Sequence, residues 1–362
     1  TSDLDIVVEG DSRLLAEKLS EKLATSRLTV HESFGTANIL LKNGFYIDIA
    51  SSRREEYDFP GALPTVEESN LKDDLFRRDF TINAMALCLN EEQYGEIIDY
   101  YGGFRDLQQG EIRFLHNLSF IEDPTRILRA IRFAERYNFK IAKITEDAIT
   151  TALEAGVLSR VSIERFSEEL FLIYREPHYQ AMGNKLIEYG IFKTWFGFDY
   201  PWNFKENNYL VNQWPLEKRW LVSIKNIDND GIEKILSLLK LDKELSKTTL
   251  KYIDLRKKLG IKPLDLIVLD EILHNSPEVI INVFLHHKEY AQWIKEYLNA
   301  LSRVKTKVTG KQLIQMGFKE GPEIGDILKK IRIKWMLGEI NTFEEECRYI
   351  KSLCKAEKSN NI

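Results

Sequence analysis

Alternating and helical hydrophobic patterns in the first fifty residues predict a small α/β unit. Residues 3–8 begin with two acids separated by one apolar residue and continue into a β-branched run, which predicts a strand with both acids on one face. Apolar residues then recur with a helical period over residues 11–24. Two further strand-like segments, 37–42 and 45–50, are joined by an Asn-Gly pair that favours a hairpin turn.

The pattern changes twice further along the chain. Residues 51–69 are polar and interrupted by proline and glycine, which predicts a loop. From about Asn117 the apolar spacing is helical almost throughout, and strand alternation does not recur. We therefore predict an α+β protein, with a mixed α/β head followed by an all-α remainder.

Composition narrows the class of protein. The chain has 362 residues, 44% of them apolar and 30% charged, which suits two or three domains with real cores. With a net charge of −5, any nucleic-acid binding must come from a local basic face. Three cysteines without CxxC spacing argue against a disulfide framework or a zinc site and suit a cytoplasmic location. No apolar run is long enough for a membrane span, and there is no signal-peptide pattern.

The first strand carries the strongest candidate for a metal site. Asp3 and Asp5 would offer a pair of hard oxygen ligands of the kind that Mg²⁺ prefers. Asp48 lies in the middle of an otherwise apolar strand, where an acid needs a partner or a metal, so it is a candidate third carboxylate. The alternatives are a surface turn for the pair and a salt-bridged edge position for Asp48.

Residues 77–84 form a second candidate site. Within them, Arg78 offers a cation for phosphates, and Asp79 and Asn83 offer groups that bind ribose hydroxyls. The alternative is a solvated, charged turn before a buried helix.

A predicted helix after Pro124 carries the third candidate site. Its apolar residues cover one side, and arginines form a stripe on the other, which favours forked recognition of phosphates or base edges over a merely solvated face. Asp123 can accept from an exocyclic amine and Arg126 can donate to a ring nitrogen, so the pair would accept ATP and CTP and reject UTP and GTP. The alternative is that Asp123 caps the helix, although Glu122 could take over that cap. The stripe comprises Arg126, Arg129, Arg132 and Arg136.

Two later segments complete the set. Arg165 and Glu169 are four residues apart on a predicted helix, a structural ion-pair spacing that we expect to brace the neighbouring element. Near the end, Lys305, Lys307 and Lys311 run into a glycine-punctuated turn and could hold an RNA backbone, with a solvated face as the alternative.

Taken in order, these motifs resemble those of the class II tRNA nucleotidyltransferases and the bacterial poly(A) polymerases, a branch of the polymerase-β-like nucleotidyltransferases. The resemblance covers nearly the whole chain. It implies that residues 3–5 are the metal-binding acids and that residues 77–84 sense the ribose. Residues 122–126 would be the nucleotide template, Glu164, Arg165 and Glu169 would lie on the helix that supports it, and residues 309–325 would hold tRNA. The family also has a Gly-Gly-x-Val-Arg-Asp element before the acids, and since this chain enters a strand directly after Thr1, we expect that residues are missing upstream.

The resemblance also implies domains and an activity. We expect a catalytic head at 1–115, a neck at 116–185, a body at 186–300 and a tail at 301–362. The implied reaction is Mg²⁺-dependent, template-independent addition of C, A or both to the 3′ end of tRNA from CTP and ATP, with release of pyrophosphate. An enzyme that adds only A would need a partner nucleotidyltransferase. The alternatives are a bacterial poly(A) polymerase and a catalytically silent RNA-binding module.

Overall fold

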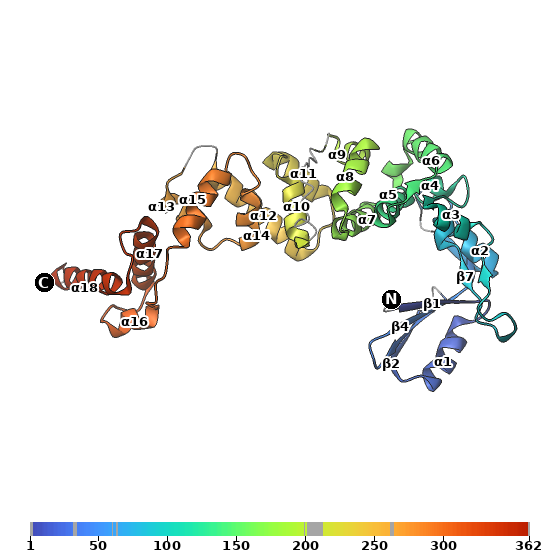
Figure 1. The fold of residues 1–362 in the computed structure, drawn as a ribbon, viewed down its shortest axis with the longest axis horizontal. Helices are drawn as coiled ribbons and strands as arrows, with labels where there is room; N and C mark the ends of the chain where they lie inside the picture. Colours follow the sequence, from blue (N-terminus) through green and yellow to red (C-terminus); the bar gives the residue numbers. More distant parts are fainter. Residues whose placement is uncertain are drawn as a thin grey trace. The chain divides into compact units, whose positions relative to one another are not determined.

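The computed structural model describes residues 3–31, 35–59, 61–62, 64–198, 200, 213–260 and 264–360, the side chains of 355–360 excepted (Figure 1). The first part is a mixed α/β head, as predicted. Its elements are β1 Asp3–Val8, α1 Ser12–Lys22, β2 Thr25–His31, β3 Thr36–Leu41, β4 Tyr46–Ser51, β5 Arg53–Glu56, β6 Thr65–Glu68, α2 Leu71–Phe76, β7 Ala86–Leu87, β8 Ile97–Ile98, α3 Gly103–Gln109, β9 Glu111–Ile112 and α4 Ser119–Glu122, with single 3-10 turns at Thr81–Asn83 and Glu91–Gln93.

The rest of the described chain is helical except for one two-residue strand. Its elements are α5 Thr125–Tyr137, β10 Lys140–Ile141, α6 Lys143–Glu154, a 3-10 turn at Val157–Arg160, α7 Ile163–Arg175, α8 Tyr179–Glu188, α9 Ile191–Phe196, α10 Leu216–Ile224, α11 Asn229–Leu238, α12 Lys243–Leu259, α13 Leu266–Leu273, α14 Glu278–Phe284, α15 Ala291–Leu301, α16 Gly310–Gln315, α17 Pro322–Leu337 and α18 Phe343–Asn360. The α+β prediction is therefore confirmed. In the described residues, no helix is long and apolar enough to cross a membrane.

The head is built on a four-stranded sheet with the order β1-β4-β3-β2. β1 pairs with β4 in parallel, and the other two pairs are antiparallel. Apolar residues on one face of the sheet pack under α1, and this cluster includes the buried Ala16, Ile39, Ile47 and Ile49. The opposite face is therefore left for polar side chains.

Two details of the head differ from the sequence prediction. β2 at the sheet edge was not predicted, because its half-polar pattern has no clear alternation. Residues 51–69, predicted as a loop, contain the antiparallel pair β5–β6. Arg54 and Glu67 form an ion pair across these two strands. The strands were missed because they are rich in charged residues and lack the alternating apolar pattern by which a strand is predicted.

By its contacts the chain divides into two compact units, which are described separately. One comprises Thr1–Asn212 with Glu233–Lys240, and the other Gln213–Ile232 with Leu241–Ile362. In the first unit, α5 packs against both α7 and α8. The expected four-part division into head, neck, body and tail stays a prediction.

The second unit has a buried ion pair and a compact end. Arg332 of α17 donates to Asp270 of α13, which is fully buried. The last helices share an apolar core around Leu313, Ile331 and Trp335. The Thr309 side chain caps α16 in a capping box.

Close packing at Gly103 fixes the loop that contains Asp79 and Asn83. A Cβ at Gly103 would lie 2.1 Å from the carbonyl oxygen of Thr81. We therefore expect Gly103→Ala to lower the free energy of unfolding by about 2–3 kcal/mol, the cost of overpacking a filled site. Thermal unfolding tests this, with Gly325→Ala, where a Cβ meets nothing within 4 Å, as the control. Equal melting temperatures for the two variants would contradict it.

Candidate active site

The acids of the head lie on one face of its sheet. β1 and β4 pair in the register that places Asp5 directly beside Asp48, and Asp3 shares the face of Asp5 because side chains alternate along a strand. Asp3 and Asp5 are exposed, and Asp48 is partly buried and accepts a hydrogen bond from the Asn38 amide. The three carboxylates therefore gather on the face opposite the core under α1.

These three carboxylates suit a Mg²⁺ ion that is held partly by the protein and partly by the phosphates of a substrate. In the described residues, no three His, Cys, Asp or Glu side chains form a ready-made metal cage. Protein-bound Mg²⁺ is usually held by one or two carboxylates together with substrate phosphates and water, so a complete cage is not needed. Asp3 and Asp5, with Asp48 beside them, fit that role.

The Asp79 side chain is fully engaged within the protein. One carboxylate oxygen accepts from the Phe80 backbone N–H and from the Asn83 amide, both at 2.9 Å. The other accepts from Nε and a terminal nitrogen of Arg129, at 2.8 and 2.6 Å. The ribose role expected for Asp79 is therefore better suited to Asn83, whose amide oxygen remains as an acceptor at the pocket that Asn83 lines.

A pocket of about 410 Å³ brings the second and third candidate sites together. Arg78 enters it from the end of α2, donating to Asp74, while its buried Nε has no hydrogen-bond partner in the described structure. Sequence reasoning missed Glu55 and Tyr57, which hydrogen-bond to each other, because they lie in the polar segment that was predicted as a loop. The lining residues are Glu55, Tyr57, Arg77, Arg78, Asp79, Asn83, Asp123, Arg126 and Arg129.

Asp123 binds the first residue of α5 and faces the pocket. Its Oδ1 accepts from the backbone N–H and the hydroxyl of Thr125, at 3.0 and 2.6 Å, while Pro124 occupies the cap position of the helix. The suggestion that Glu122 takes over the cap is wrong, since Glu122 ends α4. Arg126 is buried and anchored by hydrogen bonds to Ser119 Oγ and the Arg77 carbonyl, at 2.8 and 2.6 Å. Two of its five N–H groups are used in this way, and the guanidinium lines the same pocket as Asp123.

The arginine stripe on α5 is mostly paired with carboxylates. Arg129 connects Asp79 to Glu169, and Arg132 is buried and donates to the other oxygen of Glu169 at 2.9 Å. Arg136 is paired with Glu176. Arg132 lies away from both pockets, so its geometry suits structural support rather than the nucleotide contact expected of it.

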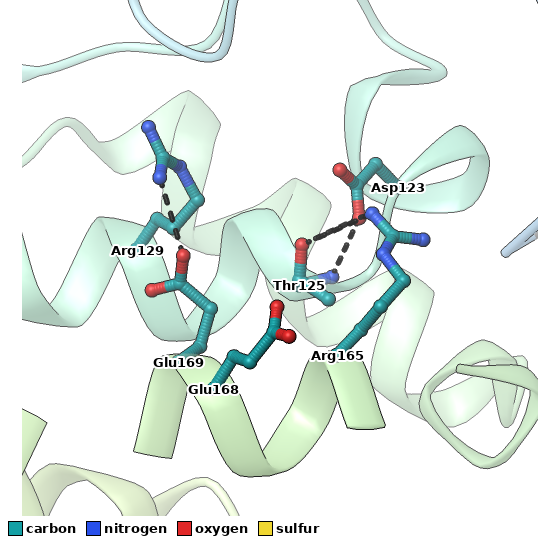
Figure 2. Close-up of a pocket in the computed structure, with 6 residues that line it drawn as sticks. All are labelled: Asp123, Thr125, Arg129, Arg165, Glu168 and Glu169. Carbon is teal, nitrogen blue, oxygen red and sulfur yellow. Dashed lines mark hydrogen bonds and ion pairs between the residues drawn. The ribbon is translucent and has the colours of Figure 1, made fainter. Parts of the chain in front are cut away.

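The α7 helix braces α5, but not through the pair expected from the spacing. Arg165 reaches across to Asp123 Oδ1 at 2.7 Å, and Glu169 reaches across to Arg129 (Figure 2). Glu169 also contacts Arg132. In the described structure, no ion pair joins Arg165 to Glu169. Glu164 instead lies near Lys240, at 3.4 Å. The bracing role is thus visible in the geometry, while the i,i+4 ion pair is not formed.

The tail lysines lie in the second unit. Lys305, Lys307 and Lys311 are all exposed and have no ion pair in the described structure. Unpaired cations of this kind are free to contact phosphates. The RNA-binding role of these three lysines stays a prediction.

His116 gives the first unit a pH-dependent stability. Burial and the neighbouring Arg126 lower the pKa of His116 to about 4, although Glu122 lies 3.5 Å away and has its own pKa raised by burial. Between pH 6.5 and 4, His116 is protonated in the unfolded chain but stays neutral in the folded protein. The free energy of unfolding therefore falls as the pH drops through this range.

We expect His116 to contribute about 1–2 kcal/mol to the loss of stability between pH 7 and 5. Urea unfolding at both pH values should therefore show a smaller loss for His116→Asn than for the wild type. The same exchange at the exposed His31 is the control. An equal loss in wild type and His116→Asn would refute the assignment.

A mixed sheet with acids in register, followed by helices that carry an arginine-lined pocket, is the architecture of a polymerase-β-like nucleotidyltransferase. The poly A polymerase head domain family matches residues 1–113, and the family described as the probable RNA and SrmB-binding site of polymerase A matches residues 138–198. The A-adding tRNA nucleotidyltransferase of Halalkalibacterium halodurans is 30% identical over 96% of this chain and 84% of its own length. This chain belongs to the family of tRNA nucleotidyltransferases.

Two further comparisons agree with this assignment. The A-adding tRNA nucleotidyltransferase of Geobacter sulfurreducens is 33% identical over 96% of this chain, but the match spans only 42% of that relative's length. The solved structure of the Thermotoga maritima CCA-adding enzyme complexed with tRNA is 31% identical, with a TM-score of 0.72, and covers 98% of this chain and 87% of that one. The resemblance noted from the motifs is therefore confirmed.

Proposed function

We propose that this protein adds nucleotides to the 3′ end of tRNA, using ATP, CTP or both and releasing pyrophosphate. One observation carries the proposal: Asp123 and Arg126 line one pocket with Arg78 and Asn83. Asp123 supplies an acceptor and Arg126 a donor, the pattern that matches the amine and ring nitrogen of adenine and cytosine. Solved structures of a similar CCA-adding enzyme are complexes with CTP and with ATP, which supports the choice of nucleotides.

The residues of this chain act by positioning and by neutralising charge. Arg78 donates to the triphosphate, Asn83 accepts from the ribose, and the anchored Arg126 holds the base edge. Asp3 and Asp5, with Asp48, hold Mg²⁺. When bound, Mg²⁺ lowers the pKa of the RNA 3′-hydroxyl and stabilises negative charge on the phosphates.

The reaction forms one bond and breaks one. The RNA 3′-oxygen forms a bond to the α-phosphorus, the bond from that phosphorus to the bridging oxygen of the β-phosphate breaks, and pyrophosphate leaves. The hydroxyl proton passes to solvent. No covalent protein intermediate is needed, so the acids serve as ligands and not as nucleophiles.

Within this reaction class we propose addition of the terminal A. The A-adding relatives align over 91–96% of this chain, whereas the CC-adding relatives align over 36–37%. An A-adding enzyme needs a partner nucleotidyltransferase that supplies the CC end. We place the reaction in the cytoplasm, which agrees with the free cysteines Cys88, Cys347 and Cys354.

Single-nucleotide incorporation tests the proposal. The protein is incubated with Mg²⁺ and labelled tRNAs that end before CCA, after C or after CC, with CTP, ATP or both. Addition of one A to the CC-ended tRNA alone is the expected result. Extension of all three to CCA would indicate a self-sufficient enzyme, and long A-tails on unrelated RNA would indicate a poly(A) polymerase. No incorporation with intact tRNA binding would favour a silent RNA-binding module.

A further inference from the structure

A second, smaller pocket lies between α5 and α7, beside the first. Its volume is about 220 Å³, below the roughly 300–1,000 Å³ that is typical of sites for whole drug-sized ligands, so it suits one part of a ligand. It shares Asp123 and Arg129 with the larger pocket, so the two are neighbours. Its lining residues, drawn in Figure 2, are Asp123, Thr125, Arg129, Arg165, Glu168 and Glu169.

Two of the three acids in this pocket are engaged by the protein. Asp123 Oδ1 accepts from Thr125 and is paired with Arg165. Glu169 divides its two oxygens between Arg129 and Arg132. These contacts hold the side chains that form the walls of the pocket, and they balance the charges of Asp123 and Glu169.

Glu168 is different. It lies three residues after Arg165 on α7, so the two side chains are neighbours on the helix surface, and Glu168 is exposed to solvent. Figure 2 shows its carboxylate directed into the pocket between those two side chains. In the described part of the chain, no hydrogen bond or ion pair holds this carboxylate. It is therefore an acceptor available to a ligand.

The chemistry of the pocket restricts that ligand. An ionised carboxylate only accepts hydrogen bonds, so Glu168 must meet a donor and will repel a phosphate or a carbonyl oxygen. A nucleobase that carries an exocyclic amine fits, and the acceptance of the cytosine N4 amine by Glu is an established pairing. Uracil has a carbonyl at the same place and does not fit.

Nucleotidyl transfer brings two nucleotides side by side, the incoming one and the last one of the acceptor RNA. We propose that the larger pocket takes the incoming nucleotide and that Glu168 reads the 3′-terminal base of the acceptor as cytosine in the smaller pocket. This inference rests on the proposed function and adds a specificity residue to it. Glu168 thereby makes addition conditional on a finished CC end.

The test uses the full-length protein and compares two tRNA 3′ ends as acceptors. Initial rates of AMP addition are measured on two tRNAs that differ only in ending with CC or with CU, for the wild type, Glu168→Gln and Glu154→Gln. Glu154, on α6, is exposed and lines neither pocket, so its variant controls for the lost charge. We expect wild type and Glu154→Gln to prefer the CC end by on the order of 10-fold or more, and Glu168→Gln to lose most of that preference.

A neutral glutamine both accepts and donates, so it meets the uracil carbonyl without repulsion. Glu168→Asp, which keeps the charge, should retain the direction of the preference at a lower rate. The KM for ATP should stay at the wild-type value in both variants, since the incoming nucleotide lies in the other pocket.

Two outcomes would overturn this inference: an unchanged preference in Glu168→Gln, or a change in the choice of ATP over other triphosphates. Either leaves the proposed function standing. No addition of AMP or CMP by the wild type to any tRNA would instead remove the proposed function itself.

Discussion

Asp5→Asn should reduce nucleotide addition by at least about 10³-fold while tRNA binding stays within about twofold of wild type. The exchange removes one of the two adjacent charges on β1 and β4 that face the same side of the sheet. Stabilising charge at the reacting phosphate is worth several kcal/mol, and each 1.36 kcal/mol is a tenfold change in rate. Single-turnover incorporation and filter binding on the same preparation measure the two quantities.

The matched control for Asp5→Asn is Glu17→Gln on α1, an exposed acid on the covered side of the sheet. It should leave both the rate and tRNA binding unchanged. Raising the Mg²⁺ concentration should recover part of the activity of Asp5→Asn, because a weakened site fills at higher metal concentration. Near-normal turnover by Asp5→Asn at ordinary Mg²⁺ would remove Asp5 from the metal site.

Arg129→Met should destabilise the first unit by about 3–5 kcal/mol, the usual cost of leaving a buried charge without its partner. Arg129 holds one oxygen of Asp79 and one of Glu169, and Asp79 is only 8% exposed. The exchange therefore leaves Asp79 without a cationic partner, while Glu169 keeps its ion pair with Arg132. Urea unfolding measures the loss, and activity should fall with it, because the loop bearing Asn83 is tied to Asp79.

Arg54→Met is the control for this effect. Arg54 also pairs with a carboxylate, Glu67, but both side chains are about half exposed, so the expected cost is about 0–1 kcal/mol. Combining Arg129→Met with Asp79→Asn should cost clearly less than the sum of the two single exchanges, since they remove the same pair. If the two losses of unfolding free energy were simply additive, Arg129 and Asp79 would not interact energetically.

Local patterns were enough to predict the architecture and the sites that depend on local spacing. Alternation placed Asp3 and Asp5 on one face, and the Asn-Gly turn predicted the hairpin that brings Asp48 into the sheet. The register of Asp5 beside Asp48 is a parallel pairing between strands some forty residues apart. No local sequence pattern indicates that the two strands pair, so only the structure shows that Asp5 and Asp48 lie on the same face of the sheet.

What sequence reasoning missed depends on partners that are distant in the chain. The spacing of Arg165 and Glu169 is correct for an ion pair, but Arg165 pairs with Asp123, just before α5, and Glu169 pairs with Arg129 on α5. Arg132 belongs to the basic stripe, yet it is buried beside Glu169 and does not line the larger pocket. Glu168 gave no signal either, because an acid on a helix surface is usually solvated and only the pocket reveals where it points.

The contacts of Asp123 limit which substitutions this protein can accept at that position. The same carboxylate binds the first residue of α5, pairs with α7 and faces the larger pocket. A substitution of Asp123 that altered base preference would therefore also remove the contacts of Asp123 with Thr125 and Arg165, so we expect it to cost stability. Substitutions at Tyr57 and Glu168, which line the pockets without bonding to the start of a helix, should cost less stability.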